Sequence, residues 1–124
     1  MNTLNYMFFE EFKKLDKVCK EIYNSDVGVT NYIKDMQSVP RNKYLFIKNF
    51  ELNLKYLIRF RHIRNHLAHS EGGFDEKVCT EEDIVLIKNF HKRILTCSDP
   101  IALVLKNEKY QKNILPITLL NIPI

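Results

Sequence analysis

The sequence has few of the residues that build turns and cross-links. Its 124 residues include three glycines, four prolines, three cysteines and no tryptophan. So few glycines and prolines leave little room for the many tight turns of a β-sandwich or barrel. The cysteines, at positions 19, 79 and 97, are odd in number and widely spaced, which favours free thiols in a reducing compartment. None of their spacings is that of a zinc site.

Long apolar runs are also missing. No stretch reaches the roughly 18 apolar residues that a membrane-spanning helix needs, and the N-terminus lacks the basic-then-apolar order of a signal peptide. We therefore expect a cytoplasmic protein without membrane contact. The sequence has 19 lysine and arginine residues and 15 aspartate and glutamate residues. This small excess of positive charge does not by itself identify a nucleic-acid-binding protein. Six basic residues nevertheless gather near the middle of the chain: Lys55, Arg59, Arg61, Arg64, Lys92 and Arg93.

Apolar residues recur with the period of a helix in four segments. These run from about 5 to 23, from 28 or 30 to 36, from 42 to 69, and from 80 to 97. Thr80 and Asp83 have the spacing of a capping box at the start of the last segment. Asp99 and Pro100 resemble a cap and a first-turn proline, so a further short helix is expected to about residue 106.

The final residues, 114–124, are apolar and contain two prolines. We expect neither a helix nor a central strand there. Such a tail should pack across the core or on a second subunit, because exposed it would promote aggregation. With no repeat or linker in the sequence, residues 1–124 are predicted to form one all-α domain, an up-and-down bundle of four main helices plus short extra helices.

The predicted helix over 42–69 is apolar on two sides. One stripe holds Ile47, Phe50, Leu54, Leu57 and Ile58, and a second, nearly opposite, holds Leu45, Leu52, Tyr56, Phe60, Ile63 and Leu67. A helix of this kind is central to its bundle or is shared with a dimer partner. Past Ile58 the first stripe turns polar, with Arg61, Arg64, Asn65 and Ala68, and His69 at its edge. Polar groups that interrupt a packing stripe are costly unless they are paired or used, so we expect the functional site here.

Arg64, Asn65 and His69 form an Arg-Asn-x-x-x-His motif at the end of this helix. The motif resembles the signature of the HEPN superfamily, small all-α domains of which many are metal-independent endoribonucleases. The residues that carry the resemblance are confined to 61–69. The resemblance implies a homodimeric, cytoplasmic RNA-cleaving enzyme of toxin or phage-defence type that needs no metal or other cofactor. An antitoxin or another regulatory protein is a further expected partner.

The resemblance also implies roles for individual residues. Arg64 would bind and polarise the scissile phosphate through its planar guanidinium group, His69 would move protons or stabilise the transition state, and Asn65 would orient the site. Because the nucleophile is the RNA's own 2′-hydroxyl, the products would carry 2′,3′-cyclic phosphate or 3′-phosphate ends. Further RNA contacts are expected from Arg61, His66, Arg59 and His62.

Two features limit this interpretation. In a HEPN subgroup paired with nucleotidyltransferase antitoxins a tyrosine lies two residues after the histidine, where this chain has Glu71, so control through that tyrosine is not expected. Ideal helix geometry also places Arg64 and His69 about 140° apart around the axis. They can meet only if a partner subunit supplies one of them or if the helix end is distorted.

Three other interpretations remain open. The motif could be a polar helix end in which the arginine pairs with an acid and the histidine caps carbonyl groups. The chain could be a non-catalytic helical module that binds RNA or protein with the same fold. It could also be a metal-binding regulatory protein that uses His62 and His66, although His62 and His69 lie about 10 Å apart along the axis, which disfavours a three-histidine site.

Overall fold

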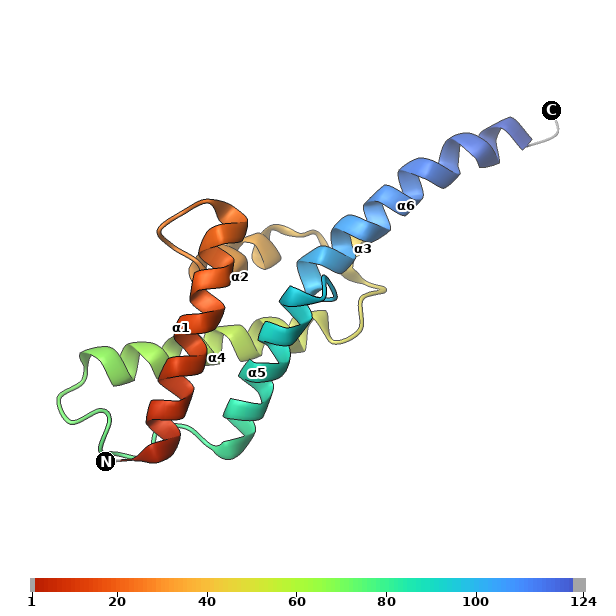
Figure 1. The fold of residues 1–124 in the computed structure, drawn as a ribbon. Coiled ribbons are helices and arrows are strands. Elements are labelled where there is room, and N and C mark those ends of the chain that lie inside the picture. The colour runs from red at the N-terminus through yellow and green to blue at the C-terminus, as the bar shows by residue number, and fades with distance from the viewer. Residues whose placement is uncertain (1, 122–124) are drawn as a thin grey trace.

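The computed structural model describes the backbone of residues 2–121 and the side chains of residues 2–110. Within these residues every regular element is a helix, which confirms the all-α prediction. Figure 1 shows their arrangement. The helices are α1 (Thr3–Tyr23), α2 (Val29–Ser38), α3 (Arg41–Tyr44), α4 (Phe50–His69), α5 (Glu81–Leu95) and α6 (Pro100–Asn121).

Local side-chain chemistry sets several helix ends. The side chain of Asn2 accepts a hydrogen bond from the Asn5 amide at 3.3 Å, and α1 ends at Asn24 in the left-handed region. The predicted capping box of α5 is present: the Thr80 hydroxyl accepts from the Asp83 amide, and the Asp83 carboxylate accepts from the Thr80 amide. The start of α5 therefore follows from the sequence alone.

One buried core joins α1, α2, α4 and α5. Every fourth or third residue of α1 and α4 faces it, as the period of the helix requires. Its largest fully buried side chains are Tyr32, Phe8, Phe60, Leu15, Ile33, Met36, Leu57, Ile63 and Ile87. No helix in the described part of the chain is long and apolar enough to cross a bilayer.

The directions in which the helices run differ from those of the predicted up-and-down bundle. α1 and α5 run in the same direction, and α4 crosses them (Figure 1). The side chain of Asn5, near the start of α1, contacts Val78 and Cys79, just before α5 begins. The reason is the connection over 70–80, which is long enough to carry the chain from the end of α4 back to the beginning of α1.

Two predicted helix ranges were also wrong. The segment 42–69 is split into α3 and α4 by a turn in which Asn49 has a left-handed backbone, with φ of 60°. The short helix expected from residue 100 to 106 is instead the long α6, which takes in residues 114–121. Residues 101–113 contain neither glycine nor proline to end the helix, and the backbone stays helical through Pro116, although a proline removes one helical hydrogen bond. The expected packing of the 114–124 tail concerns side chains outside those described.

Candidate functional site

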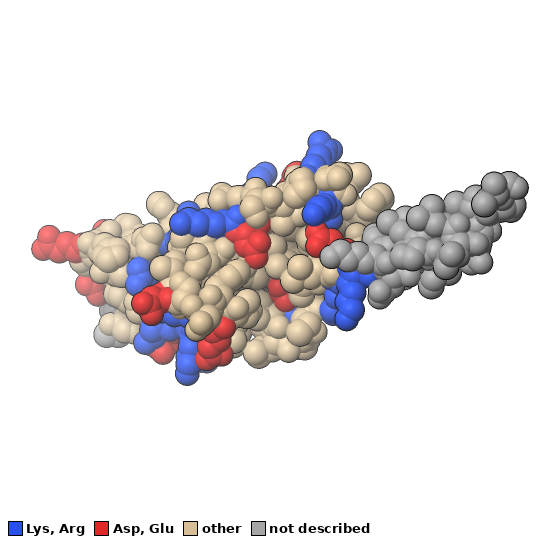
Figure 2. All heavy atoms as spheres, turned by 90° about the horizontal axis from the view of Figure 1, so that it is seen from above, with Lys and Arg blue, Asp and Glu red and all other residues tan. Residues whose placement is uncertain are grey.

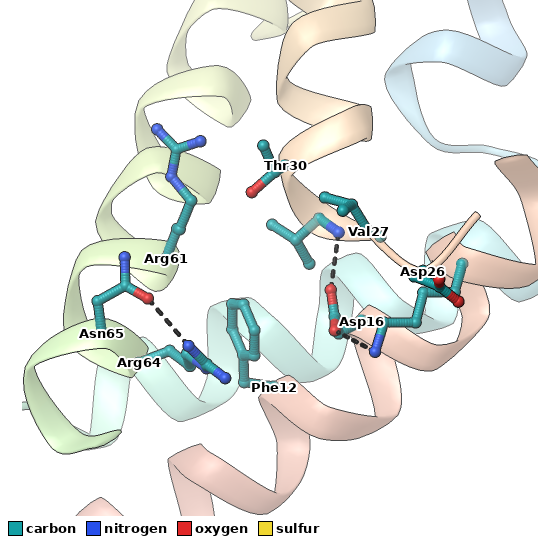
Figure 3. Close-up of a pocket in the computed structure, with 11 residues that line it drawn as sticks. Phe12, Asp16, Asp26, Val27, Thr30, Arg61, Arg64 and Asn65 are labelled. Carbon is teal, nitrogen blue, oxygen red and sulfur yellow. Dashed lines mark hydrogen bonds and ion pairs between the residues drawn. The ribbon is translucent and has the colours of Figure 1, made fainter. Parts of the chain in front are cut away.

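A hollow of about 300 Å³ lies where the C-terminal half of α4 faces α1 and the start of α2 (Figure 3). Three residues of the predicted motif region line it together. The lining residues are Phe12, Asp16 and Lys20 from α1, Asp26, Val27, Gly28, Val29 and Thr30 from the turn and the start of α2, and Arg61, Arg64 and Asn65 from α4. The structure therefore brings Arg61, Arg64 and Asn65 into one site, as the spacing predicted.

The packing of α4 positions these side chains. Ile63 and Leu67 are buried in the core on one side of the helix, which leaves Arg61 and Arg64 half-buried at the edge of the hollow. Nη1 of Arg64 donates a hydrogen bond to Oδ1 of Asn65 at 3.1 Å. Among the described side chains, no carboxylate forms an ion pair with either arginine. Two cationic groups thus share a cavity with no acid bound to them.

The opposite wall carries an acid that is already paired. Oδ1 of Asp16 accepts from the amide of Val29 at 2.9 Å, at the N-terminus of α2, and Oδ2 lies 3.2 Å from Nζ of Lys20 (Figure 3). The helix dipole and the lysine both stabilise this carboxylate. Gly28 makes the contact possible, because a Cβ there would meet the carbonyl oxygen of Asp16 and would lie 2.7 Å from its Oδ1. No pattern in the sequence indicated this contact.

The motif histidine does not belong to the hollow. His69 and His62 are exposed on the outer face of α4, and neither lines the cavity. His66 is half-buried, with Nδ1 3.2 Å from the hydroxyl of Ser70. Within one chain, Arg64 and His69 therefore do not converge, as the ideal helix geometry predicted.

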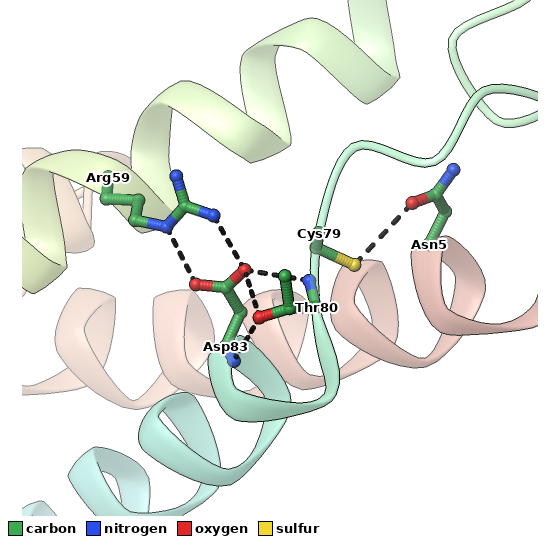
Figure 4. A network of polar contacts seen from close by, with 5 residues as sticks. All are labelled: Asn5, Arg59, Cys79, Thr80 and Asp83. Atoms are coloured by element: carbon green, nitrogen blue, oxygen red, sulfur yellow. Dashed lines mark hydrogen bonds and ion pairs between the residues drawn. The ribbon is translucent and has the colours of Figure 1, made fainter.

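Arg59 lies elsewhere. Its Nε and Nη2 donate to the two oxygens of the Asp83 carboxylate at 2.7 and 2.8 Å (Figure 4). Burial opposes the charge of Asp83, but hydrogen bonds from Arg59 and Thr80 outweigh it and hold the pKa of this carboxyl below its ordinary value. The hydrogen bond to Asp83 in turn raises the pKa of Arg59. Arg59, which was expected to contact RNA, thus links α4 to the start of α5 through its ion pair with Asp83.

Asn5 fixes the connection that follows the motif. Its fully buried side chain donates to the carbonyl groups of Glu76 and, at 3.2 Å, Phe74. Its Oδ1 accepts from the Val78 amide and from Sγ of Cys79 (Figure 4). A carboxamide on the apolar stripe of α1 was the available signal in the sequence. By holding residues 74–79 against α1, Asn5 limits where the end of α4 can lie.

Charge on the visible surface is mixed. Figure 2 shows lysine and arginine side chains interspersed with aspartate and glutamate rather than gathered into one basic face. The six basic residues grouped in the sequence are also separated: Arg61 and Arg64 line the hollow, whereas Lys92 and Arg93 line a different groove. Among the side chains described, no three histidine, cysteine or acidic residues come together as metal ligands would.

Residues 6–116 match one protein family, which is described as a family of unknown function (DUF6548). No curated protein and no solved structure matches the chain. The arrangement of its own residues is therefore the available evidence for what the protein does.

Proposed function

This chain belongs to the DUF6548 family, and since the function of that family is unknown, we propose from the site itself that the protein is a metal-independent endoribonuclease of the HEPN type, acting on RNA as a homodimer. The observation that carries the proposal is the hollow that both Arg61 and Arg64 line, where neither forms an ion pair with a described carboxylate. A half-buried arginine pair without a counter-ion favours an anionic ligand, and a phosphodiester matches the planar, two-pronged geometry of the guanidinium group.

The chemistry requires few groups. The ribose 2′-oxygen attacks the adjacent phosphorus while a base takes its proton. The bond from phosphorus to the 5′-oxygen then breaks, and that oxygen receives a proton. In this proposal Arg64, oriented by Asn65, binds the phosphate and offsets the charge that develops on it. His69 transfers a proton, and Arg61 binds a neighbouring phosphate.

The positions of the two motif residues give a reason for the dimer. His69 is exposed and lies outside the hollow that holds Arg64. A histidine transfers a proton only within hydrogen-bond reach of the reacting oxygen. We therefore propose that the C-terminal end of α4 in one subunit docks against the hollow of a second copy, so that His69 of one subunit lies beside Arg64 of the other.

The exposed position of His69 also supports a second candidate, a non-catalytic module that binds RNA through the hollow. Such a module would bind RNA equally well without His69 and would lose binding when Arg61 and Arg64 are replaced. Its affinity would fall steeply with salt, because each phosphate contact releases counterions.

Purified protein incubated with total cellular RNA in EDTA separates the two candidates. Wild type should cleave the RNA and leave 2′,3′-cyclic phosphate or 3′-phosphate ends, and His69→Ala should bind RNA but fail to cut it. His91→Ala, which removes a histidine from α5 outside the hollow, is the matched control and should cleave like wild type. Binding without cleavage by the wild type would reject the nuclease in favour of the module.

A further inference from the structure

A second cavity, of about 420 Å³, lies at the other end of α4, where its N-terminal half faces the C-terminal half of α5. It lies in the size range of small-ligand sites, which is roughly 300–1,000 Å³. We call it the α4–α5 groove. Its lining residues are Asn49, Leu52, Asn53, Tyr56 and Phe60 from α4 and the turn before it, and Leu86, Asn89, Phe90, Lys92 and Arg93 from α5.

The floor and the rim of the groove differ in chemistry. Phe60 and Phe90 are buried and form an apolar floor, and the half-buried ring of Tyr56 stacks on that of Phe60 with an interplanar angle of 18°. The rim carries three carboxamides, from Asn49, Asn53 and Asn89, and two cations. No carboxylate is among the lining residues. A flat aromatic ligand with an anionic group fits this combination.

The cationic end of the groove is partly fixed in advance. Nη1 of Arg93 donates to Oδ1 of Asn53 at 3.1 Å, and its Nε donates to the carbonyl of Ser98 at the same distance. These bonds hold the guanidinium group in place and leave its Nη2 group for a ligand. Lys92, the preceding residue, is exposed and forms no ion pair with any described side chain.

From these residues we infer that the α4–α5 groove binds one unpaired nucleotide of an RNA strand. The base stacks on the half-buried ring of Tyr56, the exposed carboxamide of Asn89 meets its polar edge, and Lys92 and Arg93 bind its phosphate. Stacking on an aromatic side chain with a cation nearby is how proteins hold single strands. Two cations without any acid among the lining residues favour the anionic phosphate of a nucleotide over an apolar helix of a protein. This inference rests on the proposed function, since it assumes that RNA is the ligand.

The inference is tested with a fluorescein-labelled, single-stranded RNA hexamer of mixed sequence with 2′-O-methyl groups. Without a free 2′-hydroxyl the hexamer cannot be cut, so binding is measured apart from cleavage. Fluorescence anisotropy gives the affinity, and NMR spectra of ¹⁵N-labelled protein follow the side-chain amide signals of the asparagines. Binding should shift the signals of Asn53 and Asn89. Removal of the Tyr56 ring by Tyr56→Leu should weaken binding by roughly five- to a hundredfold.

Two further variants test whether binding of the hexamer depends on the α4–α5 groove. Lys92→Ala should weaken binding and reduce its salt dependence by about one phosphate contact. Lys34→Ala, which removes an exposed lysine of α2 outside the groove, should leave the affinity within about twofold of wild type, as surface cations away from a contact do. Circular dichroism and thermal melting verify that each variant is folded.

These experiments distinguish a failure of the groove inference from a failure of the proposed nuclease function. Binding of the hexamer with shifts in the groove, in a protein that cuts no RNA, would support the inference and reject the nuclease. Cleavage of ordinary RNA without any effect of Tyr56→Leu or Lys92→Ala on hexamer binding would overturn the inference and retain the nuclease. No binding of the hexamer, or shifts confined to residues 61–69, would also overturn it and would leave the groove to a peptide ligand.

Discussion

Tyr32 is fully buried, and its hydroxyl group joins α2 to the start of α6. It donates to Oδ2 of Asp99 at 2.5 Å and accepts from the Ile101 amide at 3.0 Å. Burial and the nearby Asp99 carboxylate raise the pKa of Tyr32 above its ordinary value of 10.0. The folded chain therefore holds this proton more tightly than the unfolded chain does, and the stabilisation is lost as pH rises above the unfolded value.

Tyr32→Phe should lower the free energy of unfolding by about 1–3 kcal/mol, because the buried Asp99 carboxylate loses a donor. In wild type the free energy of unfolding should decrease as pH rises above about 10, and in the variant this decrease should be smaller. Urea denaturation at several pH values measures both effects. Tyr44→Phe is the control: its hydroxyl contacts Glu51 at the surface, so little change is expected. Equal effects of the two substitutions would contradict this role of Tyr32.

The candidate site could be predicted at the residue scale only where its members share one helix. Arg61, Arg64 and Asn65 lie within five positions, so their common side followed from the helical period. Asp16 and Gly28 come from segments that the sequence does not place beside α4. The ion pair between Arg59 and Asp83 likewise joins two helices, which is why the sequence did not indicate this structural role of Arg59.

The stability of α5 depends on its first turn. There the Asp83 carboxylate is part of the capping box and also accepts a hydrogen bond from Arg59. Asp83→Ala should lower the free energy of unfolding near neutral pH by about 1–2 kcal/mol, the usual cost of a lost cap. Because Arg59 is half exposed to solvent, its ion pair with Asp83 adds little to this loss of free energy. Because the folded chain lowers the pKa of Asp83, its stabilisation is present above the unfolded value near 4 and is lost as pH falls.

Urea denaturation at neutral and at acid pH measures this dependence. The difference in unfolding free energy between wild type and Asp83→Ala should be larger at neutral pH than near pH 3. Glu82→Ala, an exposed neighbour in the same turn, should change stability little at either pH. The same loss for Asp83→Ala at both pH values would show that the charge of this carboxylate contributes nothing.

The start of α2 forms one wall of the hollow and depends on Gly28. Gly28→Ala should destabilise the protein by roughly 1–3 kcal/mol, as overpacking of a tight contact does, because the new Cβ displaces Asp16 from the Val29 amide. Thermal melting measures the loss, and the NMR shift of the Val29 amide reports the broken hydrogen bond. Val27→Ala, at an exposed position of the same turn, should leave both unchanged. An unshifted Val29 amide in Gly28→Ala would contradict the proposed contact.

Two helix limits were predictable because they depend on neighbouring residues: the capping box of α5 and the proline that opens α6. The break between α3 and α4 was not, since Leu45 and Ile47 continue the apolar period through it. In the structure that turn leaves Leu45 56% exposed, although the periodic pattern placed it on an apolar stripe. The direction of α5 relative to α1 depends on how residues 70–80 pack on Asn5, a contact between distant segments that the sequence did not indicate.

At the scale of the whole molecule, α4 links two cavities of different chemistry. The hollow at its C-terminal end presents arginines, and the α4–α5 groove near its N-terminal end presents aromatic rings and carboxamides. The helix has 20 residues, about 30 Å at 1.5 Å per residue. Several nucleotides of an extended strand could span that length. We therefore expect a single-stranded RNA substrate that contacts α4 along much of its length.

The central claim is that Arg64 of one subunit and His69 of the other form a single active site. Arg64→Ala and His69→Ala should each abolish RNA cleavage in EDTA while the proteins remain folded and dimeric. After the two variants are mixed and allowed to exchange subunits, half of the dimers are mixed and each contains one intact site, so about a quarter of wild-type activity should return. The most direct measurement is therefore the cleavage rate of the mixture compared with each variant alone. Recovery of activity is the predicted result, and a mixture as inactive as its components would contradict the shared site.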